Sequence, residues 1–286
     1  MQAQIQSFFD PATHTITHVV FDREGGSAAV IDPVWDFNPH SGRTATHSVD
    51  QVADFLRGQR LRLEWILETH AHADHLSAAQ HLRREFGGRI GIGARIQQVQ
   101  DAFRRIYNLG DDFAADGRQF DHLFEDGERF RIGDLEAEAI LVAGHTPADL
   151  MYLIGDAAFI GDTMFMPDTG TARCDFPGGD ARALYRSIRR ILALPEQTRL
   201  YLCHDYAPDE RAPQWQTSVA EQRRANIHVH DGIDEDSFVA MREKRDATLD
   251  MPVLLIPSIQ VNIRAGQLPP AEGNGRHYLK FPVDAL

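Results

Sequence analysis

The sequence contains one dense group of potential metal ligands, in the segment His-Ala-His-Ala-Asp-His at residues 70–75. Three imidazoles and a carboxylate occur there within six residues, as His70, His72, Asp74 and His75. Imidazole nitrogen and carboxylate oxygen suit borderline and hard divalent metals such as zinc, iron and manganese. The alanines between them leave room for these side chains to turn toward one point. The segment therefore predicts a metal site and not a solvated polar loop.

Three further potential ligands each follow a short apolar segment that reads as a strand. They are His145 in Gly-His-Thr, Asp162 in Gly-Asp-Thr and His204 in Cys-His-Asp-Tyr. A single histidine after a strand is more often a packing or capping residue than a ligand. Together with the first cluster, however, these three complete a coherent set of seven ligands. The ligand types permit two zinc ions as readily as one iron.

The elements that must position these residues alternate between strands and helices. Apolar and β-branched runs predict strands at Thr13–Phe21, Ser27–Val34, Leu61–Leu67, Ile90–Ile92, Leu150–Ile154, Ala157–Ile160 and Leu200–Cys203. Apolar residues at helical spacing predict helices from Ser48, where Gln51 suggests a capping box, and at Ser77–Phe86, Ile96–Leu109, Asp180–Leu194, Gln214–Arg224 and Asp234–Arg245. Irregular chain with several prolines is expected after the last helix.

This order predicts an α/β fold with layers, an αββα sandwich in one domain over residues 1–286. We expect the core to cover about residues 1–210, with a C-terminal helical and irregular extension over about 211–286. Most of the candidate ligands stand where strands end, which is where α/β architectures place functional groups.

Composition narrows the range of partners and compartments. Of 286 residues, 29 are Lys or Arg and 42 are Asp or Glu, which gives a net charge of −13. An acidic chain without a basic run is a poor candidate for binding nucleic acid. No apolar stretch reaches the length of a membrane span, and the first residues lack the pattern of a signal peptide. Only two cysteines, Cys174 and Cys203, suit a reducing cytoplasm.

The four motifs His-Ala-His-Ala-Asp-His, Gly-His-Thr, Gly-Asp-Thr and Cys-His-Asp-Tyr, in this order, resemble those of the metallo-β-lactamase superfamily over about the first 210 residues. The resemblance implies the αββα sandwich with a metal site at one edge of its sheets. In the dinuclear hydrolases of the family, one metal site corresponds to His70, His72 and His145. The other corresponds to Asp74, His75 and His204, with Asp162 bridging the two metals.

Two local segments, Thr-His-Ala-His-Ala-Asp-His-Leu-Ser-Ala-Ala and Gly-Thr-Ala-Arg-Cys-Asp-Phe, resemble the persulfide dioxygenase branch, which is related to glyoxalase II. That branch implies one Fe(II) held by His70, His145 and Asp162. The remaining four ligand types, His72, Asp74, His75 and His204, would then orient ligands or hold water around the iron. The implied reaction converts glutathione persulfide, O₂ and water into sulfite and glutathione. The alternative is a glyoxalase II-like thioester hydrolase with two zinc ions, while a non-catalytic sensor would be expected to lack a ligand.

The resemblance also implies residues that bind the substrate. Arg173 would hold a carboxylate of glutathione, and Tyr206 would reach the active site and bond the metal-bound species. Arg224 lies in a segment that forms the outer pocket for the glutathione tail in related enzymes. Some persulfide dioxygenases carry a cysteine after a C-terminal Asn-x-Arg, where this chain has Ala265. The sequence leaves the oligomeric state open, and base rates alone make a homodimer plausible.

Overall fold

A computed structural model describes residues 2–208 and 211–284, and two six-stranded sheets form its centre. The first sheet has the order β1 (Gln4–Asp10), β2 (Thr15–Phe21), β3 (Ser27–Ile31), β6 (Arg62–Leu67), β8 (Arg89–Gly93) and β9 (His122–Phe124). The second has the order β10 (Glu128–Ile132), β11 (Leu135–Leu141), β12 (Leu150–Ile154), β13 (Ala157–Phe159), β14 (Arg199–Tyr201) and β15 (Gln216–Ser218). A small third sheet joins β5 (Arg43–Ala45), β4 (Val34–Asn38) and β7 (Leu76–Ser77).

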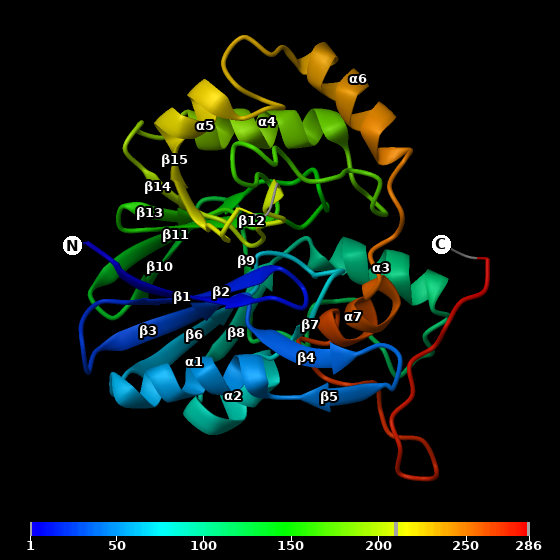
Figure 1. Ribbon diagram of the computed structural model, residues 1–286. Coiled ribbons are helices and arrows are strands. Elements are labelled where there is room, and N and C mark those ends of the chain that lie inside the picture. The colour runs from blue at the N-terminus through cyan, green and yellow to red at the C-terminus, as the bar shows by residue number, and fades with distance from the viewer. Residues whose placement is uncertain (1, 209–210, 285–286) are drawn as a thin grey trace.

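Helices cover the outer face of each large sheet (Figure 1). The helices are α1 (His47–Gly58), α2 (Ala79–Phe86), α3 (Ile96–Ile106), α4 (Ala181–Leu192), α5 (Val219–Ala225), α6 (Glu235–Asp246) and α7 (Leu255–Asn262). Helices α1 and α2 lie against the first sheet, and α4 lies against the second with α5 and α6 beside it. Within the described ranges, no helix combines the length and the apolar character needed to span a bilayer.

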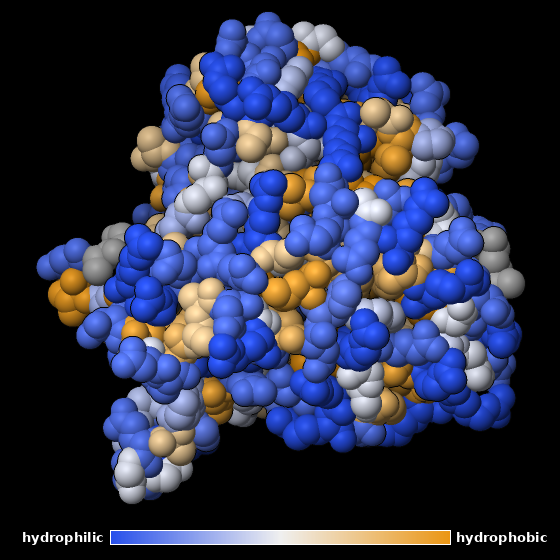
Figure 2. Space-filling model, turned by 180° about the vertical axis from the view of Figure 1, so that it is seen from behind, coloured by the Kyte–Doolittle hydropathy of each residue, from blue (hydrophilic) through white to orange (hydrophobic). Residues whose placement is uncertain are grey.

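Three apolar clusters fill the spaces between the four layers. The middle cluster joins the two sheets and includes Ile31, Leu67, Tyr152 and Phe159. A second cluster packs the first sheet against α1, α2, α3 and α7, and a third packs the second sheet against α4, α5 and α6. Strands that bury both faces carry nearly continuous apolar runs, as β3 and β12 do. The predicted αββα sandwich is therefore confirmed. On the face seen from behind, polar residues predominate and apolar residues gather only in small groups (Figure 2).

The predicted strand Ser27–Val34 is wrong as a single element. Asp32 takes a left-handed backbone with φ +51°, and Pro33 follows it without an amide hydrogen, so β3 ends at Ile31 and β4 belongs to the small sheet. The predicted capping box is also wrong. Helix α1 begins at His47, and the Ser48 hydroxyl donates to Asp36 at 2.7 Å instead of capping the helix.

Several other boundaries differ from the prediction. Helix α3 ends at Ile106, because Asn108 adopts a left-handed φ of +46° and cannot continue it. Residues 216–218 of the predicted helix Gln214–Arg224 form β15, and Ser218 caps α5 by accepting a hydrogen bond from the Glu221 amide at 3.1 Å. Strand β1 was not predicted at all.

The chain after residue 210 contributes to both halves of the sandwich, each of which consists of one large sheet and the helices that cover it. Strand β15 pairs with β14, and α7 contributes Leu255 and Ile259 to the cluster beneath the first sheet. The expected irregular end therefore contains a helix, which is a correction to the prediction. Pro257 is accommodated because it stands in the first turn of α7, where no intrahelical partner for an amide is needed.

Candidate metal centre and active site

Seven potential ligands meet at one edge of the sandwich, where several strands end. Leu67 of β6 leads into the 70–75 loop, and the segments after β11, β13 and β14 supply His145, Asp162 and His204. Gly161 allows the tight turn before Asp162, because its φ is +53° and a Cβ there would lie 2.9 Å from the Thr69 hydroxyl. The structure thus brings together the seven residues that the sequence pattern singled out.

The seven residues form two neighbouring groups. In the first, His70 Nε2 and His145 Nε2 each lie 3.7 Å from the same Asp162 oxygen, Oδ2. These separations exceed a hydrogen bond and leave space for an ion bonded to all three groups at about 2.0–2.2 Å. The second group comprises His72, Asp74, His75 and His204.

Contacts within the second group are closer than those within the first. His204 Nε2 lies 3.1 Å from Asp74 Oδ2, and His75 Nδ1 lies 3.3 Å from the same oxygen. Asp162 Oδ1 connects the groups, since it lies 3.4 Å from His204 Nε2.

Hydrogen bonds fix which nitrogen of each imidazole is free. His145 Nδ1 donates to the Arg173 carbonyl at 2.8 Å, so its Nε2 carries the lone pair. Thr69 donates its hydroxyl hydrogen to Asp32, so His70 Nδ1 donates to that hydroxyl at 3.0 Å. Nε2 of His70 is buried without a partner.

His72 leaves Nδ1 free, whereas the other histidines of the centre leave Nε2 free. Its Nε2 donates to Asp32 Oδ1 at 2.9 Å and lies 3.2 Å from Glu68 Oε2, which leaves Nδ1 buried and unpartnered. Nε2 of both His75 and His204 is likewise buried without a hydrogen-bond partner. Buried polar atoms are normally paired, so this group of unpaired nitrogens fits a cation-binding centre.

The charges around the histidines shift their pKa values in different directions. Burial, together with the neighbouring imidazoles of His72 and His145, holds the pKa of His70 well below its usual value. Burial also opposes the charge on His204, but the carboxylates of Asp162 and Asp74 outweigh it and raise that pKa to about 9. His72 likewise has its pKa raised, against the effect of burial, by Asp32 and Glu68. A metal must therefore displace protons from part of the site in order to bind there.

A cavity of about 820 Å³ opens onto these residues. Asp74, His145 and Asp162 lie in its wall, and its size falls in the range of small-molecule sites. Tyr206 also lines it, with its ring stacked on His204 at a centroid distance of 5.4 Å and an exposed fraction of 45%. The structure thus places Tyr206 beside the metal centre.

Three arginines line the same cavity, and they differ in their ion-pair partners and in their exposure. Arg173 forms an ion pair with Asp175 at 2.6 Å and donates to the Asp250 carbonyl at 2.6 Å. Arg242 is buried and paired with Asp246 at 2.6 Å. Arg245 is exposed, and no carboxylate of the described residues pairs with it. Arg224 is exposed on α5 and is not among the residues that line the cavity.

Sequence reasoning missed Asp32 and Glu68, which hold His72, and the cavity arginines on α6. A signal existed for Asp32, because it follows an apolar strand exactly as Asp162 does. Glu68 precedes His72 by four residues but carries no motif of its own. Both cysteines are buried, and burial raises the pKa of each thiol, so neither is a reactive thiolate.

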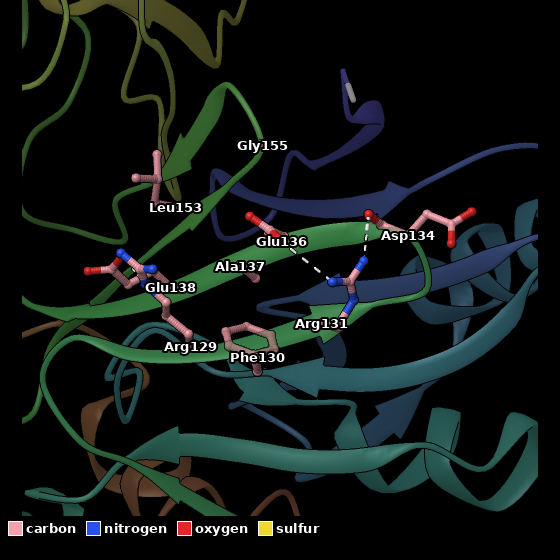
Figure 3. Close-up of a pocket in the computed structure, with 9 residues that line it drawn as sticks. All are labelled: Arg129, Phe130, Arg131, Asp134, Glu136, Ala137, Glu138, Leu153 and Gly155. Atoms are coloured by element: carbon pink, nitrogen blue, oxygen red, sulfur yellow. Dashed lines mark hydrogen bonds and ion pairs between the residues drawn. The ribbon is translucent and has the colours of Figure 1, made fainter.

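A second hollow of about 660 Å³ lies over β10, β11 and β12, away from the metal centre (Figure 3). It is lined by cross-strand pairs of opposite charge, such as Arg129 with Glu138 and Arg131 with Glu136. None of the seven ligand residues lies in its wall, so this hollow is not the candidate active site.

Comparison with known proteins identifies the class. The model of the Metallo-beta-lactamase superfamily matches residues 12–204, which include all seven ligand residues. This chain is an enzyme of that superfamily, and its ligand cluster marks a metal site.

Individual relatives carry different names. A probable metallo-hydrolase of Burkholderia pseudomallei is 53% identical, with 99% of each chain covered. A beta-lactamase hydrolase-like protein of Agrobacterium fabrum is 51% identical over 99% of this chain, which spans only 65% of that longer protein. Human persulfide dioxygenase ETHE1 is 30% identical over 71% of this chain and 68% of its own length. The crystal structure of ETHE1 from Myxococcus xanthus matches with a TM-score of 0.73 and 27% identity, covering 92% of this chain and 100% of that one.

Proposed function

We propose that this protein is a persulfide dioxygenase with one Fe(II) per chain, which oxidises glutathione persulfide with O₂ and water to sulfite and glutathione. The observation that carries the proposal is the His70, His145 and Asp162 group. Two imidazole nitrogens approach one carboxylate oxygen at equal distances of 3.7 Å, beside a cavity. Two histidines and a carboxylate are the ligand set of non-haem iron oxygenases. The similarity to human persulfide dioxygenase ETHE1, and to the structure of ETHE1 from Myxococcus xanthus, supports the same reaction.

We propose one metal and not two because of the similarity to human persulfide dioxygenase ETHE1, and not because of the second group of ligands. In that group Nδ1 of His72 and Nε2 of His75 and His204 are buried without a hydrogen-bond partner, so these residues could also hold a second metal. We assign His72, Asp74, His75 and His204 to positioning and charge balance around the iron. A carboxylate beside an imidazole also offers a site that can hold a water molecule for the reaction.

The residues of this chain hold and orient the reacting groups. Bound iron would supply open coordination positions for the persulfide sulfur and for O₂. His145 is oriented by its hydrogen bond to the Arg173 carbonyl. Tyr206 and Phe165, whose ring centroids lie 5.5 Å apart, form an aromatic wall of the cavity. Holding both reactants next to one centre supplies most of the rate enhancement that we attribute to the protein.

The substrate that we propose is anionic, and the cavity offers cations for it. Arg173 keeps three of its five N–H groups on Asp175 and the Asp250 carbonyl, so fewer of them are available to a substrate carboxylate than in an unpaired arginine. Arg245 lines the cavity without such partners among the described residues. We therefore propose Arg245, in preference to Arg173, as the residue that binds the substrate carboxylate. The outer-pocket role predicted for Arg224 has no support in its position.

The alternative function is a glyoxalase II-like hydrolysis of a glutathione thioester with two zinc ions. The complete ligand set and the hydrolase names of the bacterial relatives support it. Metal analysis of protein purified without added metal separates the two functions. We expect close to one iron per chain and little zinc. Two zinc ions per chain, together with thioester hydrolysis that consumes no O₂, would establish the hydrolase instead.

A further inference from the structure

We infer that Asn262, the last residue of α7, is a positioning residue that fixes the backbone of the metal-binding loop. Its side-chain Nδ2 donates to the carbonyls of His72 and His75, at 2.8 Å each. Its Oδ1 accepts a hydrogen bond from the amide of Ser77 at 2.8 Å. One amide side chain therefore holds three backbone groups, two in the 70–75 loop and one in β7, which follows it.

The bonds of Asn262 are protected from water and complete. The residue is only 4% exposed, and both of its N–H groups and its oxygen have partners. Residues 70–75 belong to no helix or strand, so regular hydrogen bonding does not fix their backbone. The side chain of Asn262 supplies that constraint from a position 190 residues away from His72.

A chain of contacts extends the constraint to the His72 ring. The Ser77 hydroxyl, next to the amide that Asn262 holds, donates to Glu68 Oε1. The other Glu68 oxygen lies 3.2 Å from His72 Nε2. Displacing residues 72–77 would therefore move both the backbone of His72 and Glu68, which contacts its ring.

The end of α7 is itself held in place, so Asn262 does not depend on the loop for its own position. Gln100 donates to the Ile263 carbonyl and Gln80 donates to the Ala265 carbonyl, at 2.9 Å each. Gly266 passes so close to the loop that a Cβ there would lie 2.8 Å from the Ser77 carbonyl. Asn262 lies beyond residues 12–204, where the superfamily model matches, so the C-terminal segment of the chain supplies this contact to the centre.

The chain offers a matched control for testing this role. Gln260 is on the same helix, is 1% exposed, and also uses its amide completely. It donates to the carbonyls of Ile256 and Lys280 and accepts from the Lys280 amide, so none of these hydrogen bonds goes to the metal-binding loop. Asn262→Asp and Gln260→Glu therefore make the same change, from a buried amide to an acid of the same shape, and only one of them affects the loop.

The experiment measures two quantities for each variant. The first is the thermal midpoint of the metal-free protein, which we expect to fall in both variants. The second is the affinity of the metal-free protein for Zn²⁺, by competition with a chromophoric chelator, and for Fe²⁺ without oxygen. Loss of a residue that orients metal ligands typically weakens metal affinity about 10–100-fold. We expect that loss for Asn262→Asp and a change of less than about twofold for Gln260→Glu.

Two results would overturn the inference: Asn262→Asp binding both metals within about twofold of the unaltered protein, or Gln260→Glu losing as much affinity as Asn262→Asp. If the aspartate variant does not fold, Asn262→Ser takes its place, because a hydroxyl adds no charge and can donate only one hydrogen bond. It must then weaken metal binding at least about fivefold, and an unchanged affinity would contradict the role. The inference holds for iron or zinc and is independent of the proposed reaction.

Discussion

At the residue scale, the histidines of the centre differ in which ring nitrogen they leave free. His70, His75 and His204 keep Nε2 unpartnered, whereas His72 keeps Nδ1, because Asp32 and Glu68 take its other nitrogen. An imidazole with one nitrogen tied to an acceptor has a fixed tautomer and a fixed ring orientation. The acceptors behind the histidines are therefore as much a part of the centre as the ligands.

Replacing His70, His145 or Asp162 by alanine is expected to remove bound metal and activity together. Each variant deletes one of three ligands. The two that remain are expected to bind the metal too weakly to keep it during purification. Metal content per chain and turnover on the same preparation check this. His122→Ala is the control, since that histidine pairs with Glu128 at 2.6 Å outside the ligand groups. An alanine variant with full metal and full turnover would refute the ligand assignment.

A buried histidine in the core should make folding sensitive to acid. Burial is the main cause that lowers the pKa of His18 from 6.5 to about 4. In the unfolded chain His18 binds a proton below about pH 6.5, whereas in the folded chain it does so only below about pH 4. The free energy of unfolding therefore falls as the pH drops from 6.5 to 4. The full difference is about 3 kcal/mol.

Denaturant unfolding of His18→Gln at several pH values tests this effect. Glutamine does not titrate, so the slope of stability against pH between 6.5 and 4 should be shallower by up to about 1.4 kcal/mol per pH unit. Equal slopes in the two proteins would show that His18 is not responsible.

At the element scale, α6 carries the cation that we assign to the substrate. Arg245→Met should raise KM for glutathione persulfide about tenfold or more, because a hydrogen bond to a charged group contributes about 1.5–3 kcal/mol. The kcat should change little, since Arg245 is not a metal ligand. Lys244→Met is the matched control, because Lys244 is exposed on the same helix and does not line the cavity. A KM that rises equally in both variants would indicate a general effect of positive charge on α6 and not a direct contact between Arg245 and the substrate.

The sequence predicted the elements near the ligands better than those that complete the fold. Apolar runs such as β12 and the amphipathic α4 are visible locally, because burial of their faces determines their residues. Strand β1 was missed because it is an edge strand with mixed burial. Helix α7 was missed because its prolines suggested irregular chain, while its packing against the first sheet depends on residues far away in sequence.

The same limit applies to the site. Ligand identities were visible as motifs, since metal binding requires those residue types. The contact from Asn262 to the loop, and the pairing of Arg173 with Asp175, depend on the folded arrangement of distant or flexible groups. Local spacing gives no sign of either.

At the scale of the whole molecule, the C-terminal segment completes the sandwich. A chain that ends after residue 208 loses β15, which pairs with β14, and loses Phe238 and Ile259 from two apolar clusters. We expect this truncated chain to lack a cooperative thermal transition and a folded near-ultraviolet circular dichroism spectrum. Cooperative unfolding with retained metal binding would show that residues 2–208 fold by themselves.

The stoichiometry of the proposed reaction gives the most direct test of the proposed function. The iron-loaded protein is mixed with glutathione persulfide in an oxygen electrode, and sulfite is measured in the same sample. One O₂ should be consumed for each sulfite formed, and Asp162→Ala should show neither. Sulfite formation without O₂ uptake, or no oxidation of the persulfide by protein that carries its iron, would contradict the proposed function.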